Sequence, residues 1–462
     1  MPILDPYVTA TELRDLVASG EVRPREVADF FLRRIDELNP KLSAFMTVTP
    51  ERAIEDATRL EKRKPSRLPL YGVAYSLKDL TWTKGIRTTF GSRNFADFVP
   101  DADAELADRL RNAGGILLGK TTTPEFGGRP TTEGGLCPPA RNPWNTEHTA
   151  GGSSGGAAVG VAVGMHPIAE GSDGGGSVRI PAACCGVFAI KPSRGRISLA
   201  PGYGEVWGGL FTNGPIARTV QDAALMLDVM AGPVPGDPYW AAPPSRRFVA
   251  SADRRPKGLR LATLAKSALG PVDADTVRAF ESACHVFEEL GHELEPVDLD
   301  PAALLVESFG KVVGANLAAV PFADPELIDP VVRVFYEAGR KTSAGEYVNA
   351  MAEMHNRSRE VVQKLLSYDA LLTPTLSRPA MRIGTLPSKL ESYVDEALAW
   401  LPFTFPFNAT GQPACSLPNG FSSDGLPIGL QIVGRPQDEP MIISLAAAFE
   451  EARPWRNRKP PV

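Results

Sequence analysis

The segment from Gly151 to Arg179 contains two serine clusters flanked by glycines, GGSSGG and SDGGGS, joined by a run of small and apolar residues. Glycine at this density costs backbone entropy on folding, so it is expected where the backbone must pass very close to another group. We expect that group to be a substrate carbonyl. The hydroxyls held in the two loops belong to Ser153, Ser154 and Ser177, so the segment predicts a serine-dependent site.

The composition excludes several classes of protein. Of the 462 residues, 43% are hydrophobic and 22% are charged, which indicates neither disorder nor a membrane protein. The net charge of −5 and the pI of about 5.7 provide no basic surface for nucleic acid or an anionic membrane. The N-terminal residues lack the basic and apolar regions of a signal peptide, and no apolar run is long enough to span a bilayer. We therefore expect a cytoplasmic protein that acts on small molecules.

The cysteines indicate neither a disulfide framework nor a metal site. Their number is odd, and no C-x-x-C spacing occurs. We expect buried free thiols and no metal or organic cofactor. Cys184 and Cys185 follow Ser177 closely in the sequence, and whether they help to shape the site stays open. The cysteines are Cys137, Cys184, Cys185, Cys284 and Cys415.

The first part of the chain reads as helical, and an α/β core follows. A capping box from Thr9 to Glu12 begins one helix, Gly20 ends it, and Pro24 opens a second helix that extends to about Asn39. Short apolar runs then alternate with helical stretches, which favours a sheet with helices on its faces. We expect a helical region (1–65), a core (66–235), a more variable substrate-shaping region (236–410) and a C-terminal strand and helix (411–462).

Later segments predict further elements. Helical spacing over residues 273–290 places Cys284 in a packed stripe, and a capping box from Ser343 to Glu346 begins a long helix that ends near Tyr368. Residues 375–412 are rich in proline, aromatic residues and turn signals. This stretch either lines a pocket or is a long covered loop.

Two short motifs match well-known patterns in the wrong context. GGILLGKT, from Gly114 to Thr121, fits the P-loop pattern, but the helix ends before it and the following residues favour a strand. Lys120 is then a strand-end lysine. GGSSG, from Gly151 to Gly155, fits the nucleophile elbow of the α/β-hydrolases. However, no strand precedes it, and no histidine follows His355 to act as base.

Lysine is the remaining candidate for the base that activates a serine. The S-x-x-K pattern from Ser308 to Lys311 is expected by chance and lacks a glycine-rich context. Lys78 is the stronger candidate, because it ends the apolar strand GVAYSL and is followed by Asp79. Sites gather at such strand ends, and a buried lysine is rare unless it is paired or functional.

Longer motifs resemble one family throughout the chain. The block GGSSGGAAVGVAVGMHPIAEGSDGGGSVRIPAACCGVFAIKPSRGRIS, from Gly151 to Ser198, resembles the signature of the amidase signature family. GVAYSLKDLTWTKGIRTTFGS, GGILLGKTTTPEF, RNPW and PFNATGQPACSLPNGFSSDGLPIGLQIVGRP are similar to further family motifs in the same order. The resemblance implies a single α/β/α domain on a large mixed sheet and hydrolysis of carbon–nitrogen acyl bonds.

The same resemblance implies roles for individual residues. Ser177 would be the nucleophile, Ser153 a bridging serine after a cis peptide bond, and Lys78 a base whose pKa burial must lower by about three units. The amides of the GGGS loop would form the oxyanion hole. Asp173 and Arg179 would brace that loop, and Ser154 would support the proton relay. The implied oxyanion donors are Gly174, Gly175, Gly176 and Ser177.

The substrate class remains open at this point. Variants such as GSDGGGSVR and GEVWGGLF are more similar to stand-alone amidases, including those that act on nylon-type or urethane bonds, than to the glutamine-cleaving subunit of a tRNA amidotransferase. A catalytically silent binding protein of this fold is the non-enzyme alternative, and a homodimer is one alternative for the assembly. Gly174 and Ala150 depart from the family pattern, which often has a larger residue and a proline at these positions.

Overall fold

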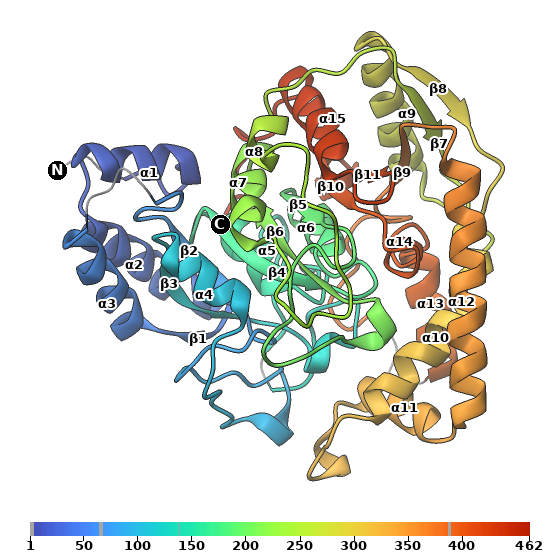
Figure 1. The fold of residues 1–462 in the computed structure, drawn as a ribbon, viewed down its shortest axis with the longest axis horizontal. Helices are drawn as coiled ribbons and strands as arrows, with labels where there is room; N and C mark the ends of the chain where they lie inside the picture. Colours follow the sequence, from blue (N-terminus) through green and yellow to red (C-terminus); the bar gives the residue numbers. More distant parts are fainter. Residues whose placement is uncertain (1–3, 64–67, 137, 387–389) are drawn as a thin grey trace.

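The computed structural model describes residues 4–63, 68–136, 138–386 and 390–462. Its strands join in one 11-stranded mixed sheet, in the order β1-β3-β2-β4-β6-β5-β10-β11-β9-β7-β8. Helices lie on both sides of this sheet (Figure 1), which confirms the predicted α/β/α architecture. The strands are β1 (Phe45–Val48), β2 (Ala74–Lys78), β3 (Ile116–Thr121), β4 (Ile168–Asp173), β5 (Phe188–Lys191), β6 (Thr212–Ala217), β7 (Arg260–Thr263), β8 (Glu293–Pro296), β9 (Ala370–Pro374), β10 (Ala414–Phe421) and β11 (Pro427–Gly434).

The sheet separates two sets of apolar side chains, because successive residues of a strand point to opposite faces. In β11, Leu430 and Ile432 pack with α4, α7, α8, α9 and α15, whereas Val433 packs on the other face with α6 and α10 to α14. Helices α2, α3 and α5 cover the rest of that second face. The helices are α1 (Ala10–Ser19), α2 (Pro24–Leu42), α3 (Pro50–Glu61), α4 (Glu105–Asn112), α5 (Gly155–Ala162), α6 (Arg179–Cys185), α7 (Val220–Met230), α8 (Phe248–Ser251), α9 (Ala274–Glu289), α10 (Pro301–Ala318), α11 (Pro330–Arg340), α12 (Ala344–Leu365), α13 (Leu390–Trp400), α14 (Pro406–Ala409) and α15 (Glu439–Ala452).

The N-terminal helices begin as predicted. The hydroxyl of Thr9 accepts the N–H of Glu12, and the Glu12 carboxylate accepts the N–H of Thr9, both at 3.0 Å. Helix α2 extends to Leu42, beyond the predicted end near Asn39, because a further turn buries the Leu42 side chain. The sequence did not predict β1, which lies within this mainly helical region and forms an antiparallel edge strand beside β3.

Parallel pairing brings two strand ends together. Strands β2 and β4 are parallel neighbours, with Ser76 opposite Ala169. Their carboxyl ends therefore meet at the same edge of the sheet, so that Lys78 at the end of β2 lies beside the end of β4. Helices α5 and α6 start at Gly155 and Arg179, directly after the two serine clusters.

The C-terminal half contains more regular structure than its sequence suggested. The capping box at Ser343 begins α12, which ends at Leu365, a few residues before the predicted end. Residues 375–412 include α13 and α14, so the alternative of a long covered loop was wrong. Strand β10, which forms an antiparallel hairpin with β11, was not predicted.

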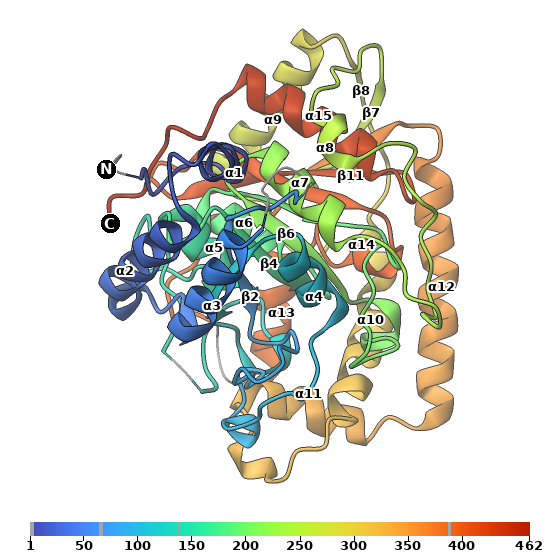
Figure 2. The same ribbon diagram turned by 60° about the vertical axis from the view of Figure 1, so that its left-hand side comes forward.

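The end of the chain returns to its beginning. The ammonium of Lys459 lies 4.4 Å from the centre of the Tyr7 ring, and Figure 2 shows both termini on the same side of the molecule. Within the described ranges, no helix combines the length and the apolar character that a membrane span requires.

Candidate active site

The Lys78 ammonium lies in the interior, between the two serine segments. Its Nζ donates to Ser153 Oγ at 2.7 Å and to Ser172 Oγ at 2.9 Å. The side chain is fully buried, and this burial lowers the pKa of Lys78 to about 7, although the carboxylates of Glu170 and Asp173 act to raise it. A large fraction of Lys78 is therefore neutral near pH 7 and able to accept a proton.

Glu170 lies directly beneath Lys78 on β4. One oxygen, Oε2, accepts the backbone N–H of Lys78 at 2.9 Å and the hydroxyl of Thr81 at 3.0 Å. The other oxygen, Oε1, has no hydrogen-bond partner among the described residues. Burial raises the pKa of Glu170, while these hydrogen bonds and the charges of Lys78 and Lys120 act to lower it. Sequence reasoning missed this residue, whose only signal was a carboxylate inside an apolar strand.

The two serine segments lie against each other. The Gly152–Ser153 peptide bond is cis, the geometry that the resemblance implied for the bridging serine. The N–H of Ser154 donates to the carbonyl of Ser177 at 3.1 Å. The Ser154 hydroxyl donates to the carbonyl of Ser172 and accepts the Ser172 N–H, both at 3.2 Å, so it joins the first loop to the end of β4.

Ser177 occupies the exposed side of this cluster. Its side chain is half-buried and lines a cavity, whereas Lys78 and Ser153 are buried. The hydrogen bonds of the described residues connect Lys78 to Ser153 but include none between the hydroxyls of Ser153 and Ser177. The structure thus places Lys78 and Ser153 in direct contact and Ser177 in the adjoining loop, whereas a shared catalytic role of the three residues stays a prediction.

The glycines pack closely, but their close neighbours are other parts of the protein rather than an open substrate position. A Cβ on Gly152 would lie 2.6 Å from the backbone of Thr131. Gly176 has φ of +133° and a Cβ there would lie 2.5 Å from Thr404 Oγ1. The glycines at these two positions therefore permit the loops to pack against neighbouring loops, and the approach of a substrate carbonyl to the second loop stays a prediction.

The carboxylate of Asp173 organises the GGGS loop. It accepts the N–H of Gly176 at 2.7 Å and the N–H of Val178 at 3.2 Å. The expectation that the Gly176 amide is a free oxyanion donor is therefore corrected. The N–H groups of Gly174, Gly175 and Ser177 have no protein acceptor among the described hydrogen bonds, and Gly175 and Ser177 also line the cavity.

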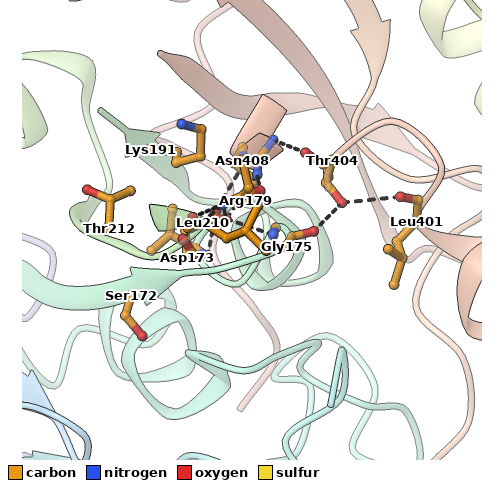
Figure 3. A network of polar contacts seen from close by, with 12 residues as sticks. Ser172, Asp173, Gly175, Arg179, Lys191, Leu210, Thr212, Leu401, Thr404 and Asn408 are labelled. Carbon is orange, nitrogen blue, oxygen red and sulfur yellow. Dashed lines mark hydrogen bonds and ion pairs between the residues drawn. The ribbon is translucent and has the colours of Figure 1, made fainter. Parts of the chain in front are cut away.

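Asp173 and Arg179 form a fully buried ion pair (Figure 3). The guanidinium donates to both carboxylate oxygens, at 2.9 and 3.0 Å. Burial alone would raise the pKa of Asp173, but the charge and hydrogen bonds of Arg179 outweigh it and hold the pKa well below its usual range. Arg179 also donates to the side chains of Asn408 and Gln431, both at 2.7 Å.

Residues of the C-terminal segment hold this loop from the other side. Thr404 Oγ1 donates to the carbonyl of Gly175 at 2.8 Å, and Asn408 Nδ2 donates to the carbonyl of Asp173 at 2.9 Å (Figure 3). Sequence reasoning did not single out Thr404, Asn408 or Gln431. The only signal was that Asn408 and Gln431 lie within the quoted C-terminal family motif.

The two departures from the family pattern have local explanations. At Gly174 a Cβ would lie 2.8 Å from the ring of Trp207, so this indole occupies the space of a larger residue. The N–H of Ala150 donates to the carbonyl of Ala140 at 3.2 Å, a hydrogen bond that proline could not make.

A cavity of about 470 Å³ opens beside Ser177. Besides Ser177 and Gly175, its walls come from residues 127–130, α10, α11 and α13, and most of these side chains are apolar. Part of the 375–412 stretch, Tyr393 to Leu401, lines it, which confirms the pocket-lining alternative for that part.

The competing motifs are structural. Lys120 lies on β3 with its ammonium buried against Thr81, Thr83 and Thr88, so GGILLGKT is a strand and not a phosphate-binding loop. Lys311 of the S-x-x-K match pairs with exposed Glu307. Cys184, Cys185 and Cys415 are buried free thiols and Cys284 is half-buried, whereas Cys137 lies outside the described residues.

Comparison with known proteins gives concordant results. The sequence model of the family described as Amidase matches residues 26–443. An acylamidase of Rhodococcus erythropolis is 37% identical over 98% of this chain and 97% of its own length. The structure of a 6-aminohexanoate cyclic dimer hydrolase complexed with substrate superposes with a TM-score of 0.93, at 31% identity and 99% coverage of both chains. A bacterial aryl acylamidase of the amidase signature family superposes with a TM-score of 0.89, at 28% identity and 97% coverage of both chains.

Proposed function

This chain belongs to the amidase signature family of enzymes, which hydrolyse carbon–nitrogen bonds in non-peptide amides, and on that premise we propose that Ser177 attacks the amide carbonyl to form an acyl-enzyme. The observation that carries the proposal is the buried contact of 2.7 Å between Lys78 Nζ and Ser153 Oγ, beside a cavity lined by Ser177. A lysine with a pKa lowered by burial to about 7 is a competent base near neutral pH.

The proposed reaction proceeds by a proton relay. Neutral Lys78 accepts the proton of Ser153 Oγ, and Ser153 accepts the proton of Ser177 Oγ as Ser177 bonds to the carbonyl carbon. The resulting tetrahedral intermediate expels the amine, which takes the proton back through Ser153. Water then attacks the acyl-enzyme by the same relay, which releases the acid and restores Ser177.

The oxyanion of the intermediate would be stabilised by backbone amides. Gly175 and Ser177 line the cavity and their N–H groups have no acceptor among the described residues, and Gly174 is a further candidate donor of the same loop. Loss of one oxyanion donor typically costs about 3 to 4 kcal/mol of transition-state stabilisation. Asp173, Arg179, Asn408 and Thr404 would act by holding this loop in place.

We propose substrates whose acyl or amine component is largely apolar. The cavity wall is formed mainly by aliphatic and aromatic side chains, such as Ile180, Phe309 and Leu398, and burial of such surface in contact with substrate favours binding. Aryl amides fit this description, and the names of the similar acylamidase and aryl acylamidase agree with it.

The test is a panel of anilides, primary amides, glutamine and carbamates, read by amine or ammonia release and by intact-mass detection of the acyl-enzyme. We expect turnover of an anilide and an acyl adduct that is absent from Ser177→Ala. An adduct that persists in Ser177→Ala would refute the nucleophile, whereas hydrolysis of glutamine alone would favour an amidotransferase subunit. The absence of any hydrolysis would favour a binding protein.

A further inference from the structure

Two largely buried polar side chains interrupt the apolar wall of the cavity. Arg129 belongs to the loop after the short 3₁₀ turn Glu125–Gly127, and Tyr393 belongs to α13. Both line the same cavity as Ser177, and Figure 2 shows α11 and α13 as neighbours. In a site that is otherwise apolar, such groups need a partner, because burying an unpaired donor costs free energy.

Arg129 has only a weak partner within the protein. Its side chain is 10% exposed, and its Nη1 lies 3.5 Å from Asp329 Oδ2. That carboxylate already accepts the backbone N–H groups of Gly135 at 3.2 Å and of Val331 at 3.0 Å, so it caps α11 as well. The Nε of Arg129 is buried and has no acceptor among the described residues.

Tyr393 presents a second donor without a partner. The residue is 2% exposed, and its hydroxyl has no acceptor among the described residues. The Arg129 guanidinium lies 5.9 Å from the centre of the Tyr393 ring, so the two groups are neighbours. Burial raises the pKa of the Tyr393 phenol, although the neighbouring Arg129 acts to lower it, so the phenol keeps its proton near neutral pH and can donate it to an acceptor.

The other charged residues at the cavity do not compete for this role. Lys311 and Glu307 pair with each other at 2.9 Å and are 47% and 83% exposed. They belong to the solvent-facing side of α10, where an ion pair contributes little. The desolvated hydrogen-bond donors of the cavity wall are therefore those of Arg129 and Tyr393, and an acceptor that enters the cavity would meet them there.

We propose that Arg129 and Tyr393 form a binding subsite for an acceptor oxygen of the substrate, carried as a carboxylate or an amide carbonyl remote from the bond that is cleaved. This inference rests on the proposed function of Ser177. It defines the substrate class as bifunctional: an apolar chain with the scissile amide at one end and a second oxygen-bearing group at the other. Such a contact acts mainly on binding, so it changes KM more than kcat.

Matched substrates test the proposal. On the acyl side, hexanoic acid anilide has no distal acceptor, adipic acid monoanilide has a carboxylate, and the corresponding adipamide anilide has a neutral amide. On the amine side, N-hexylacetamide is compared with N-acetyl-6-aminohexanoate and its primary amide. We expect the protein to favour an acceptor-bearing member of at least one series by about tenfold or more in kcat/KM.

The variants separate the subsite from the catalytic machinery. Arg129→Met should abolish this preference while hydrolysis of the unsubstituted member stays within about threefold of wild type, and Tyr393→Phe should reduce it in part. Arg333→Met is the matched control, because Arg333 on α11 also has a buried Nε without a partner but does not line the cavity. It should leave the preference unchanged.

The outcomes are distinct. A preference for the carboxylate alone assigns an ion pair, and a preference for both acceptors assigns a hydrogen bond to a carbonyl oxygen. The subsite is refuted if wild type shows no preference in either series or if Arg129→Met retains it. The proposed function has its own readout. Loss of hydrolysis of every substrate in Ser177→Ala supports Ser177 as the nucleophile whether or not wild type shows the preference, so the subsite and the proposed function can fail separately.

Discussion

The carboxylate of Glu170 accepts the backbone N–H of Lys78 at 2.9 Å, across the parallel pair of β2 and β4. A buried acid thus lies next to a buried base, at the strand ends where the two serine loops meet. The charged groups around them are Asp173 on β4 and Lys120 on β3, and Asp79 faces Lys120 in turn. The protonation of Lys78 therefore depends on its burial and on these carboxylates.

Removal of the Glu170 charge should shift the pH dependence of the reaction. Glu170 acts to raise the pKa of Lys78, so Glu170→Gln should lower it further and increase the neutral fraction. In kcat/KM measured from pH 5 to 9, the rising limb should move to lower pH. An unchanged limb in a folded variant would mean that Glu170 carries no charge over this range.

Lys78 itself should control that rising limb. With a pKa of about 7, wild-type kcat/KM should rise with pH and be half-maximal at about pH 7. Lys78→Met should lower kcat/KM by about 10²- to 10⁴-fold and remove the dependence between pH 6 and 8. Because Lys78→Met also leaves the hydroxyls of Ser153 and Ser172 without their Lys78 partner, thermal melting must show that the variant is folded before its kinetics are compared. A variant that keeps the wild-type pH profile would exclude Lys78 as the base.

Thr404 should matter for the chemical step rather than for binding. Thr404→Val removes the hydrogen bond of 2.8 Å to the carbonyl of Gly175 and loosens the loop that carries the free amides. We expect kcat to fall about tenfold with little change in KM. Thr276→Val is the control, since Thr276 is a buried threonine on α9 whose hydroxyl has no partner among the described residues. Equal effects of the two variants would argue against a positioning role.

Gly310 should leave room in the cavity for a long substrate chain. It lies within α10, lines the cavity, and a Cβ there would meet no atom within 4 Å. Gly310→Leu should therefore lower kcat/KM for a long-chain acyl anilide by about tenfold or more, and leave acetanilide within about threefold. Gly345→Leu on α12 is the control, because that position is equally open but does not line the cavity. A uniform loss on both substrates would contradict the assignment of α10 to the cavity wall.

Local signals in the sequence were sufficient for several elements. The capping boxes at Thr9 and Ser343, the αL glycine Gly20 and the apolar runs around β2 and β4 predicted elements that the structure contains. These signals succeed because the hydrogen bonds that they describe lie within a few residues of each other. Strand β10 was missed, because Pro418 and Gly420 are typical of turns and only the pairing with β5 and β11 makes it a strand.

The sequence by itself determined which groups can react: the serines of the two glycine-rich loops, a lysine at a strand end and the longer motifs that resemble a family of amidases. The tertiary structure alone decided which of them meet and which are already occupied. Lys78 and Ser153 are 75 residues apart in the chain, and the Gly176 amide is engaged by Asp173. The sequence did not single out Glu170, Thr404 or Arg129, and only the tertiary structure places them at the site or its cavity. Burial and partner geometry depend on contacts between distant segments, and these contacts set the pKa of a base and decide whether a donor remains free.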